Sequence, residues 1–286
     1  MFGLLVFLVV TTTSAYAWSR SNVWRCPRFH SFVVHFRSFS SCLRGEHSGF
    51  LYLPPYLMPK FPIPVAAVAF DLDGTLVDTL PDLHEAANRM LEDLGLPVVA
   101  ESAVRAYVGD GVDRLVKRLL TGDPEGEPDS ALFNRAGSVF RSHYASVLSR
   151  ASRPFPGVIE ALQEMRRRGL RLACITNKPA GFTEPLLHDI GLAPYLDLVL
   201  SGDSLPCKKP DPLPLLHCAQ VFGVPAPRLL MIGDSPNDTR AARAAGCPVF
   251  CVPYGYRGTL GVHELDCDAI VPALLDSMKL IEIPRS

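Results

Sequence analysis

Two acidic residues, Asp71 and Asp73, directly follow the apolar run 65–70, which is typical of a buried strand. In an open α/β sheet, ligands bind where the carboxyl ends of the strands meet, so both side chains are expected at a site. Two carboxylates held close together repel each other unless a cation or a shared proton compensates. Oxygen ligands of this kind suit Mg²⁺. The pair therefore predicts metal-assisted chemistry at the end of the first strand.

A second acidic pair begins after another apolar run, 229–232. Asp234 stands at the end of that run, and Asp238 lies four residues later, about one helical turn away. A single Asp after a strand is more often a turn or N-cap residue, so neither position carries a function alone. Together with Asp71 and Asp73, they form two acidic clusters suited to one metal ion.

A hydroxyl and an ammonium group complete the set. Thr176 and Asn177 follow the apolar run 170–175, and the neighbouring lysines Lys208 and Lys209, either of which could reach the site, precede a proline-rich start of a helix. Taken alone, Thr176 is typical of a helix cap and a lysine is typical of a solvated surface charge. Their joint placement at the ends of separate strands or in strand-to-helix loops combines acids for a metal with donors for an anion. That combination predicts a phosphate-handling site.

Short apolar runs alternate with helical patterns in the chain that must position these residues. The predicted strands are 65–70, 170–175, 196–200, 229–232, 249–252 and, more weakly, 269–271. The predicted helices between them are 160–168, 210–222 and 238–245. Alternation of this kind predicts an α/β fold, a doubly wound parallel sheet of Rossmann-like form covered on both faces.

One stretch, 80–151, breaks the alternation because it contains no convincing strand. Its helical patterns are 82–94, 100–120 and 130–148. It is too long to be a loop. We therefore expect a helical cap domain inserted after the first strand, within a core formed by 58–79 and 152–286.

Residues 1–57 differ in composition from the rest. They carry five Arg, no Lys and one acid, a net charge of +4 that leaves −5 for the remainder. An apolar start resembles a secretory signal without its basic region, and the Arg- and Ser-rich part resembles an organelle transit segment. We favour a third hypothesis, translation from Met58. It predicts a cytoplasmic protein, whereas a genuine leader predicts a secreted or organellar one.

Composition limits the partners. The overall net charge of −1 gives no sign of a polybasic nucleic-acid surface, and no apolar run reaches the length of a membrane span. The eight cysteines lack the spacing of zinc or redox motifs. We expect a small phosphomonoester as the partner, with no nucleic acid and no stable membrane span, in a monomer or a homodimer.

The clusters also follow a known order. DLDGT at 71–75, TN at 176–177, KP at 209–210 and GDSPND at 233–238 resemble the four motifs of the haloacid dehalogenase (HAD) superfamily, over about 65–272. Within it, the segments 108–112, 176–179 and 254–258 are similar to those of bacterial phosphoglycolate phosphatases. The 254–258 segment is expected near the site entrance, with no catalytic role.

The resemblance implies a role for each acid. Asp71 is the nucleophile that forms an aspartyl-phosphate. Asp73 protonates the leaving alcohol and then activates water. Mg²⁺ is held by Asp71, the backbone carbonyl of Asp73, and Asp234, while Asp238 orients Lys209 or a metal-bound water.

It also implies the phosphate and cap contacts. Thr176, Asn177 and Lys209 bind the phosphoryl group. In the cap, Gly109 and Gly111 could bring backbone amides to a small carboxylate or could simply form a turn. Arg118, with the neighbouring Arg114 and Lys117, could pair with that carboxylate or lie on a solvated helix face.

Three functions remain open at this point. The leading one is a Mg²⁺-dependent phosphatase that converts 2-phosphoglycolate to glycolate and phosphate. The second is a phosphosugar phosphatase or phosphomutase of the same superfamily, because such mutases keep both Asp71 and Asp73. The third is a phosphoacceptor signalling domain, which the cap-sized insert argues against.

Overall fold

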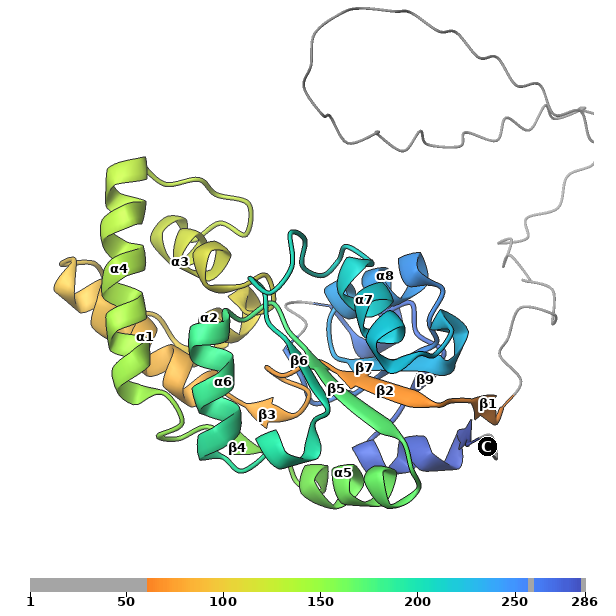
Figure 1. The fold of residues 1–286 in the computed structure, drawn as a ribbon. Coiled ribbons are helices and arrows are strands. Elements are labelled where there is room, and N and C mark those ends of the chain that lie inside the picture. Colours follow the sequence, from red (N-terminus) through yellow and green to blue (C-terminus); the bar gives the residue numbers. More distant parts are fainter. Residues whose placement is uncertain (1–60, 257–259, 284–286) are drawn as a thin grey trace, which may run out of the picture. The chain divides into compact units, whose positions relative to one another are not determined.

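The structure is a computed structural model that describes residues 61–256 and 260–283 (Figure 1). The predicted leader, 1–57, and the proposed start at Met58 lie outside the described residues. None of the helices in the described ranges combines the length and apolar character needed to cross a membrane.

Six parallel strands form the central sheet, in the spatial order β6–β5–β2–β7–β8–β9. Their bounds are β2 Ala67–Phe70, β5 Arg171–Ile175, β6 Leu198–Leu200, β7 Leu229–Gly233, β8 Val249–Cys251 and β9 Ala269–Ile270. Every strand predicted from an apolar run is confirmed, and so is the doubly wound α/β fold.

Helices cover both faces of this sheet (Figure 1). Val68 and Phe70 of β2 pack into a core shared with α5 and α6, whereas Ala67 and Ala69 pack toward α7 and α8. The helices are α5 Val158–Arg167, α6 Ala180–Asp189, α7 Leu213–Phe222 and α8 Pro236–Ala245. Helix α6 was not predicted, because Gly181 and Pro185 obscure its helical pattern.

Short elements complete the described chain. The 3₁₀ turns are η2 Ala193–Tyr195, η3 Ala226–Arg228, η4 Val262–Glu264 and η5 Leu274–Lys279. Strand β1, Ile63–Pro64, pairs in parallel with β10, Ile281–Glu282, so the two ends of the described chain lie side by side.

Chain order reverses around β2. After β2 the chain adds β5 and β6 on one side, then returns to add β7, β8 and β9 on the other. Such a reversal opens a crevice at the carboxyl ends of the strands. The residues that follow β2, β5 and β7 therefore meet at one edge of the sheet.

The insert after β2 folds as four helices around a separate core, to which Phe182 of α6 and Tyr256 also contribute. They are α1 Leu80–Asp93, α2 Glu101–Tyr107, α3 Val112–Thr121 and α4 Ser130–Val147. The single helix predicted over 100–120 is wrong. Gly109 has φ +130° and Gly111 has φ +89°, conformations outside a right-handed helix, so the chain turns between α2 and α3.

The two connections between insert and sheet lie together. Strand β3, Val77–Asp78, pairs antiparallel with β4, Arg153–Pro154. The fully buried carboxylate of Asp82 accepts hydrogen bonds from the backbone N–H groups of Ala151 and Ser152, each at 2.8 Å, and from the Ser152 hydroxyl. The Asp82 side chain, at the start of the insert, thus holds the segment where the chain returns to the sheet.

Replacing Asp82 with Ala is expected to lower the free energy of unfolding by about 3 kcal/mol, because the buried N–H and hydroxyl of Ser152 and the partly buried N–H of Ala151 lose their acceptor. Glu85→Gln is the matched control: it weakens the pairs with Arg89 and Arg150, whose side chains are 39% and 59% exposed, and is expected to cost less than about 1 kcal/mol. Urea titrations measure both values. Equal losses would show that Asp82 does not fix the connection.

Candidate active site

Residues from separate loops meet at the carboxyl edge of the sheet. Asp71 follows β2, Thr176 follows β5 and Asp234 follows β7. Lys209, from the loop before α7, reaches the same place and is 2% exposed. The structure therefore brings together the four clusters that the sequence places at strand ends.

Lys209 joins two carboxylates. Its Nζ lies 2.7 Å from Oδ1 of Asp71 and 2.7 Å from Oδ1 of Asp238. Burial opposes a charged Lys209, but these carboxylates outweigh burial and raise its pKa above the ordinary value. Lys209 is therefore an ammonium group placed against the predicted nucleophile, and its neighbour Lys208 instead binds the backbone carbonyl of Asp110 at 2.7 Å.

Asp238 has little freedom to bind anything else. Its Oδ2 accepts hydrogen bonds from the backbone N–H groups of Asp234 at 3.1 Å and Ser235 at 3.0 Å, and from the Ser235 hydroxyl at 2.7 Å. These donors lie at the beginning of α8, where a negative charge is favoured. The geometry suits the predicted role of orienting Lys209.

The acidic cluster fits a divalent cation. Ligand oxygens of Asp71, Asp234 and Asp238 all lie within 4.8 Å of one another, and Lys209 supplies one positive charge among three buried carboxylates. Burial raises the pKa of Asp71 to about 7, against the pull of Lys209. Burial and the charge of Asp71 raise the pKa of Asp234 well above its usual value. Mg²⁺ would supply the missing positive charge.

Asp234 is held from both sides. Its Oδ1 accepts a hydrogen bond from the Thr75 hydroxyl at 3.1 Å, and its Oδ2 accepts one from the backbone N–H of Tyr256. Gly74 has φ +91°, and a Cβ there would lie 2.6 Å from Oδ2 of Asp234. Glycine thus allows the loop after β2 to approach Asp234.

Tyr256 also links the site to the cap. Its hydroxyl accepts hydrogen bonds from the backbone N–H groups of Thr79 and Leu80, at 3.0 and 3.1 Å, and bonds to Asp78. The sequence analysis predicts that the segment 254–258 lies near the site entrance and has no catalytic role. The part beyond Tyr256 lies outside the described residues, and Tyr256 itself connects Asp234 to the start of α1.

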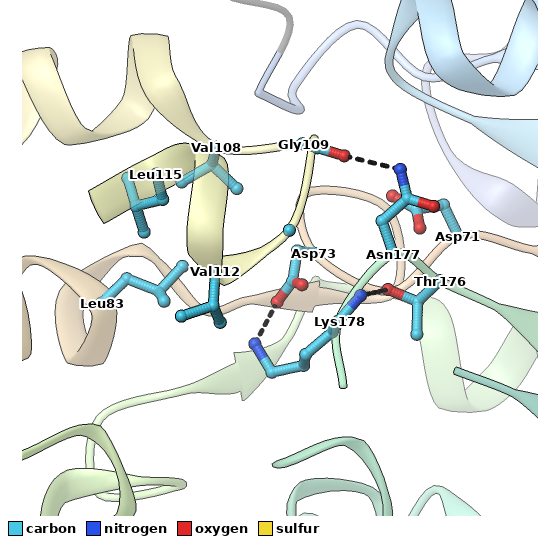
Figure 2. Close-up of a pocket in the computed structure, with 11 residues that line it drawn as sticks. Asp71, Asp73, Leu83, Val108, Gly109, Val112, Leu115, Thr176, Asn177 and Lys178 are labelled. Carbon is cyan, nitrogen blue, oxygen red and sulfur yellow. Dashed lines mark hydrogen bonds and ion pairs between the residues drawn. The ribbon is translucent and has the colours of Figure 1, made fainter. Parts of the chain in front are cut away.

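Asp73 has two partners. Its Oδ1 accepts a hydrogen bond from the Thr79 hydroxyl at 2.7 Å. The same atom accepts one from Nζ of Lys178 at 2.9 Å (Figure 2). Burial opposes the charge of Lys178, but Asp73 outweighs it and raises the pKa of Lys178 above its ordinary value. The sequence analysis assigns Lys178 no role, although this residue stands directly after the Thr-Asn pair.

Thr176 and Asn177 both line the cavity that contains Asp71 and Asp73. The Thr176 hydroxyl accepts a hydrogen bond from the backbone N–H of Lys178 at 3.1 Å. The Asn177 side-chain amide donates to the carbonyls of Gly109 at 3.0 Å and Lys209 at 2.9 Å. Protein carbonyls thus engage the side-chain amide of Asn177, and its phosphate contact stays a prediction.

The cap closes this cavity with the loop between α2 and α3 (Figure 2). Gly109 and Gly111, the two glycines named as candidate cap contacts, line this cavity. A Cβ on Gly111 would lie 3.0 Å from the Asn177 carbonyl oxygen. The Asn237 side-chain amide donates to the Gly109 carbonyl at 3.2 Å. The core thus holds the cap loop through two side-chain amides.

Arg118 is not brought to this cavity. It forms an ion pair with Asp110 at 2.7 Å and donates hydrogen bonds to the carbonyls of Tyr107 and Pro124, each at 2.9 Å. It lines an adjacent hollow that includes Lys208. In this conformation Arg118 braces the cap loop rather than facing Asp71.

Known proteins share this fold and sequence. The family model of haloacid dehalogenase-like hydrolases matches residues 65–246. A phosphoglycolate phosphatase of Thiobacillus denitrificans is 55% identical over 224 residues, covering 78% of this chain and 99% of its own length. One of Nitrosospira multiformis is 53% identical over 222 residues, covering 78% and 98%.

Solved structures of related proteins have the same fold as this chain. The crystal structure of a predicted phosphoglycolate phosphatase from Haemophilus somnus 129pt superposes with a TM-score of 0.71 at 35% identity, covering 75% of this chain and 97% of that one. The family model spans more than half of this chain, and the relatives match it over nearly their whole length. The chain belongs to the haloacid dehalogenase-like hydrolases.

Proposed function

We propose that this hydrolase cleaves phosphomonoesters with Mg²⁺ through an aspartyl-phosphate on Asp71, and that its substrate is 2-phosphoglycolate. The observation that carries the proposal is the arrangement around Asp71. A buried carboxylate shares the Lys209 ammonium with Asp238 and lies beside Asp234, while Asp73 follows two residues later. The substrate is supported by the names of the relatives at 55% and 53% identity.

The reaction uses Asp71 and Asp73 in two steps. First, a carboxylate oxygen of Asp71 attacks phosphorus while the bond from phosphorus to the bridging oxygen breaks, and Asp73 gives that oxygen a proton. Next, Asp73 removes a proton from water, which attacks phosphorus and breaks the bond to Asp71. Phosphate and glycolate leave, and both side chains return to their initial states.

Nearby hydrogen-bond donors stabilise the negative charge on the phosphoryl group. Lys209, the Thr176 hydroxyl and the backbone N–H of Asn177 bind its oxygens, and donors fixed in advance lose little on reaction. Mg²⁺, bound by Asp71, Asp234 and the backbone carbonyl of Asp73, would offset the repulsion between nucleophile and phosphate.

We propose that 80–151 acts as a cap on a core of 58–79 and 152–286. The cap loop at Gly109 lies over the cavity, held by Asn177 and Asn237. A closed cap keeps water from Asp71 during the first step and contacts the leaving group.

The substrate is tested with a panel of esters. Phosphate release is measured from 2-phosphoglycolate, glycerol phosphate, hexose phosphates and p-nitrophenyl phosphate, with Mg²⁺ and with EDTA. We expect Mg²⁺-dependent turnover with the highest kcat/KM on 2-phosphoglycolate. A higher value on a hexose phosphate would reject this substrate, and an isomeric sugar phosphate as product would show a mutase. A single stoichiometric phosphorylation would indicate a signalling domain.

Mg²⁺ is expected to raise the melting temperature more at pH 8 than at pH 6. Without metal, the raised pKa values of Asp71, to about 7, and Asp234 make the folded chain hold protons that the unfolded chain has released. Stability therefore falls as pH rises from the ordinary carboxyl range through the folded pKa values. Mg²⁺ needs ionised carboxylates, so at pH 6 it must displace the proton of Asp71, which that residue has largely released at pH 8.

Thermal melts with Mg²⁺ and with EDTA at both pH values measure this effect. Asp234→Asn removes one charged ligand and is expected to lose most of the Mg²⁺ increment at pH 8. An increment of the same size at pH 6 and pH 8 would contradict the expectation that these carboxylates bind the ion.

A further inference from the structure

Lys178 lies inside the cavity without a part in the reaction steps above. Its side chain is 3% exposed, with Nζ 2.9 Å from Oδ1 of Asp73. The ring of Tyr144, on α4 of the insert, faces the same ammonium with its centroid 4.8 Å away. Figure 2 shows the side chain extending from the end of β5 toward Asp73. A cation is thus held beside the group that protonates the leaving oxygen.

The cap side of this cavity is uncharged. Its side chains there are Leu83, Val108, Val112 and Leu115, interrupted by the backbone of two glycines. Among the described residues that line the cavity, Lys178 is the one cationic side chain. An anionic leaving group in this space therefore finds one positive partner and an otherwise apolar wall.

The cap cations that the sequence analysis names as candidates for this role are engaged elsewhere. Arg118 pairs with Asp110 at 2.7 Å, while Arg114 and Lys117 pair with Glu127 at 3.0 and 2.6 Å. None of the three lines the cavity. A cation that recognises a substrate carboxylate in this cavity must therefore come from the α/β core rather than from the insert.

We infer that Lys178 binds the carboxylate of the leaving group and so determines the preference for 2-phosphoglycolate; the inference rests on the proposed function. In this substrate the carboxylate carbon is two bonds from the bridging oxygen that Asp73 protonates. A group 2.9 Å from Asp73 is therefore within reach of it. An ammonium has three N–H donors, so Lys178 can contact Asp73 and the substrate together.

The same arrangement disfavours other esters. A hexose or glycerol leaving group would place hydroxyls against the Leu and Val side chains, where they lack hydrogen-bond partners. A neutral leaving group would leave Lys178 paired with Asp73 alone. Selectivity then comes from one charge-assisted contact and an apolar wall.

The test compares 2-phosphoglycolate with its carboxamide analogue, phosphoglycolamide, which has the same number of heavy atoms but no charge on the leaving group. For Lys178→Met, we expect kcat/KM for the acid to fall about 10- to 100-fold more than kcat/KM for the amide. Lys208→Met is the matched control. It removes a lysine that binds the cap at Asp110, outside this cavity, and is expected to leave the ratio of the two values unchanged.

A purely structural Lys178 would lower both values by the same factor, because it would act only through Asp73, and that outcome would overturn the inference. If Met at this buried position prevents folding, as judged by the melting temperature, Lys178→Gln carries the same test, since it keeps a donor toward Asp73. Wild-type enzyme that hydrolyses neither ester, or that prefers a hexose phosphate, would instead overturn the proposed function.

Discussion

Asp71→Asn is expected to reduce phosphate release from 2-phosphoglycolate by at least about 10⁴-fold, to near background. An amide oxygen in that position is a poor nucleophile, so the aspartyl-phosphate does not form. The substitution keeps the size of the side chain, and its carbonyl oxygen can still accept the hydrogen bond that Lys209 donates at 2.7 Å. The loss is therefore chemical rather than structural.

Stability separates this interpretation from misfolding. Burial raises the pKa of Asp71 to about 7, so at pH 8 the folded chain without metal carries an ionised Asp71 that costs it stability relative to the unfolded chain. We expect Asp71→Asn to melt no lower than wild type in EDTA at that pH. A folded variant that retains more than about one per cent of wild-type turnover would exclude Asp71 as the nucleophile.

The strands and the acids that follow them could be predicted because both depend on local sequence. A short apolar run followed by polar residues encodes a buried strand and its end, as at 65–70 before Asp71. Parallel pairing then brings the ends of β2, β5 and β7 to one edge without further information. The clustering of Asp71, Lys209 and Asp238 follows from this topology.

Contacts between distant segments could not be predicted in the same way. Lys178 and Asp73 are separated by 105 residues, and Tyr256 and Asp78 by 178. Lys178, Tyr256 and Asp78 carry no local signal of a role, and the acidic pair that marks Asp73 does not indicate its partner. Their partners depend on how the insert is placed on the sheet, which hydrophobic periodicity does not encode.

The turn between α2 and α3 shows a different kind of difficulty. Helical spacing continues on both sides of 108–111, so periodicity alone joins the two helices. The glycines at 109 and 111 carried the correct signal, because both have positive φ. They were considered for substrate contact, and the turn that they allow is what brings the cap loop to the cavity.

Asp73→Asn is expected to lower kcat for 2-phosphoglycolate by about 10²- to 10⁴-fold, the usual contribution of a general acid or base. The alkoxide that leaves is a strong base and requires the proton. Asn keeps an oxygen that can accept the hydrogen bonds from Thr79 at 2.7 Å and Lys178 at 2.9 Å, so the surrounding geometry is retained. Wild type and Asp71→Asn are assayed in parallel.

The decisive substrate is p-nitrophenyl phosphate, whose leaving group is a much weaker base and departs without a proton. For Asp73→Asn we expect a rapid burst of one p-nitrophenol per enzyme, followed by slow turnover, because hydrolysis of the aspartyl-phosphate still needs a base. Asp71→Asn should give no burst, since it lacks the attacking group. A variant at Asp73 that loses the burst as well would show that this residue supports the attack by Asp71 itself. Full turnover of both esters would remove Asp73 from the chemistry and leave its pairing with Lys178 as its main role.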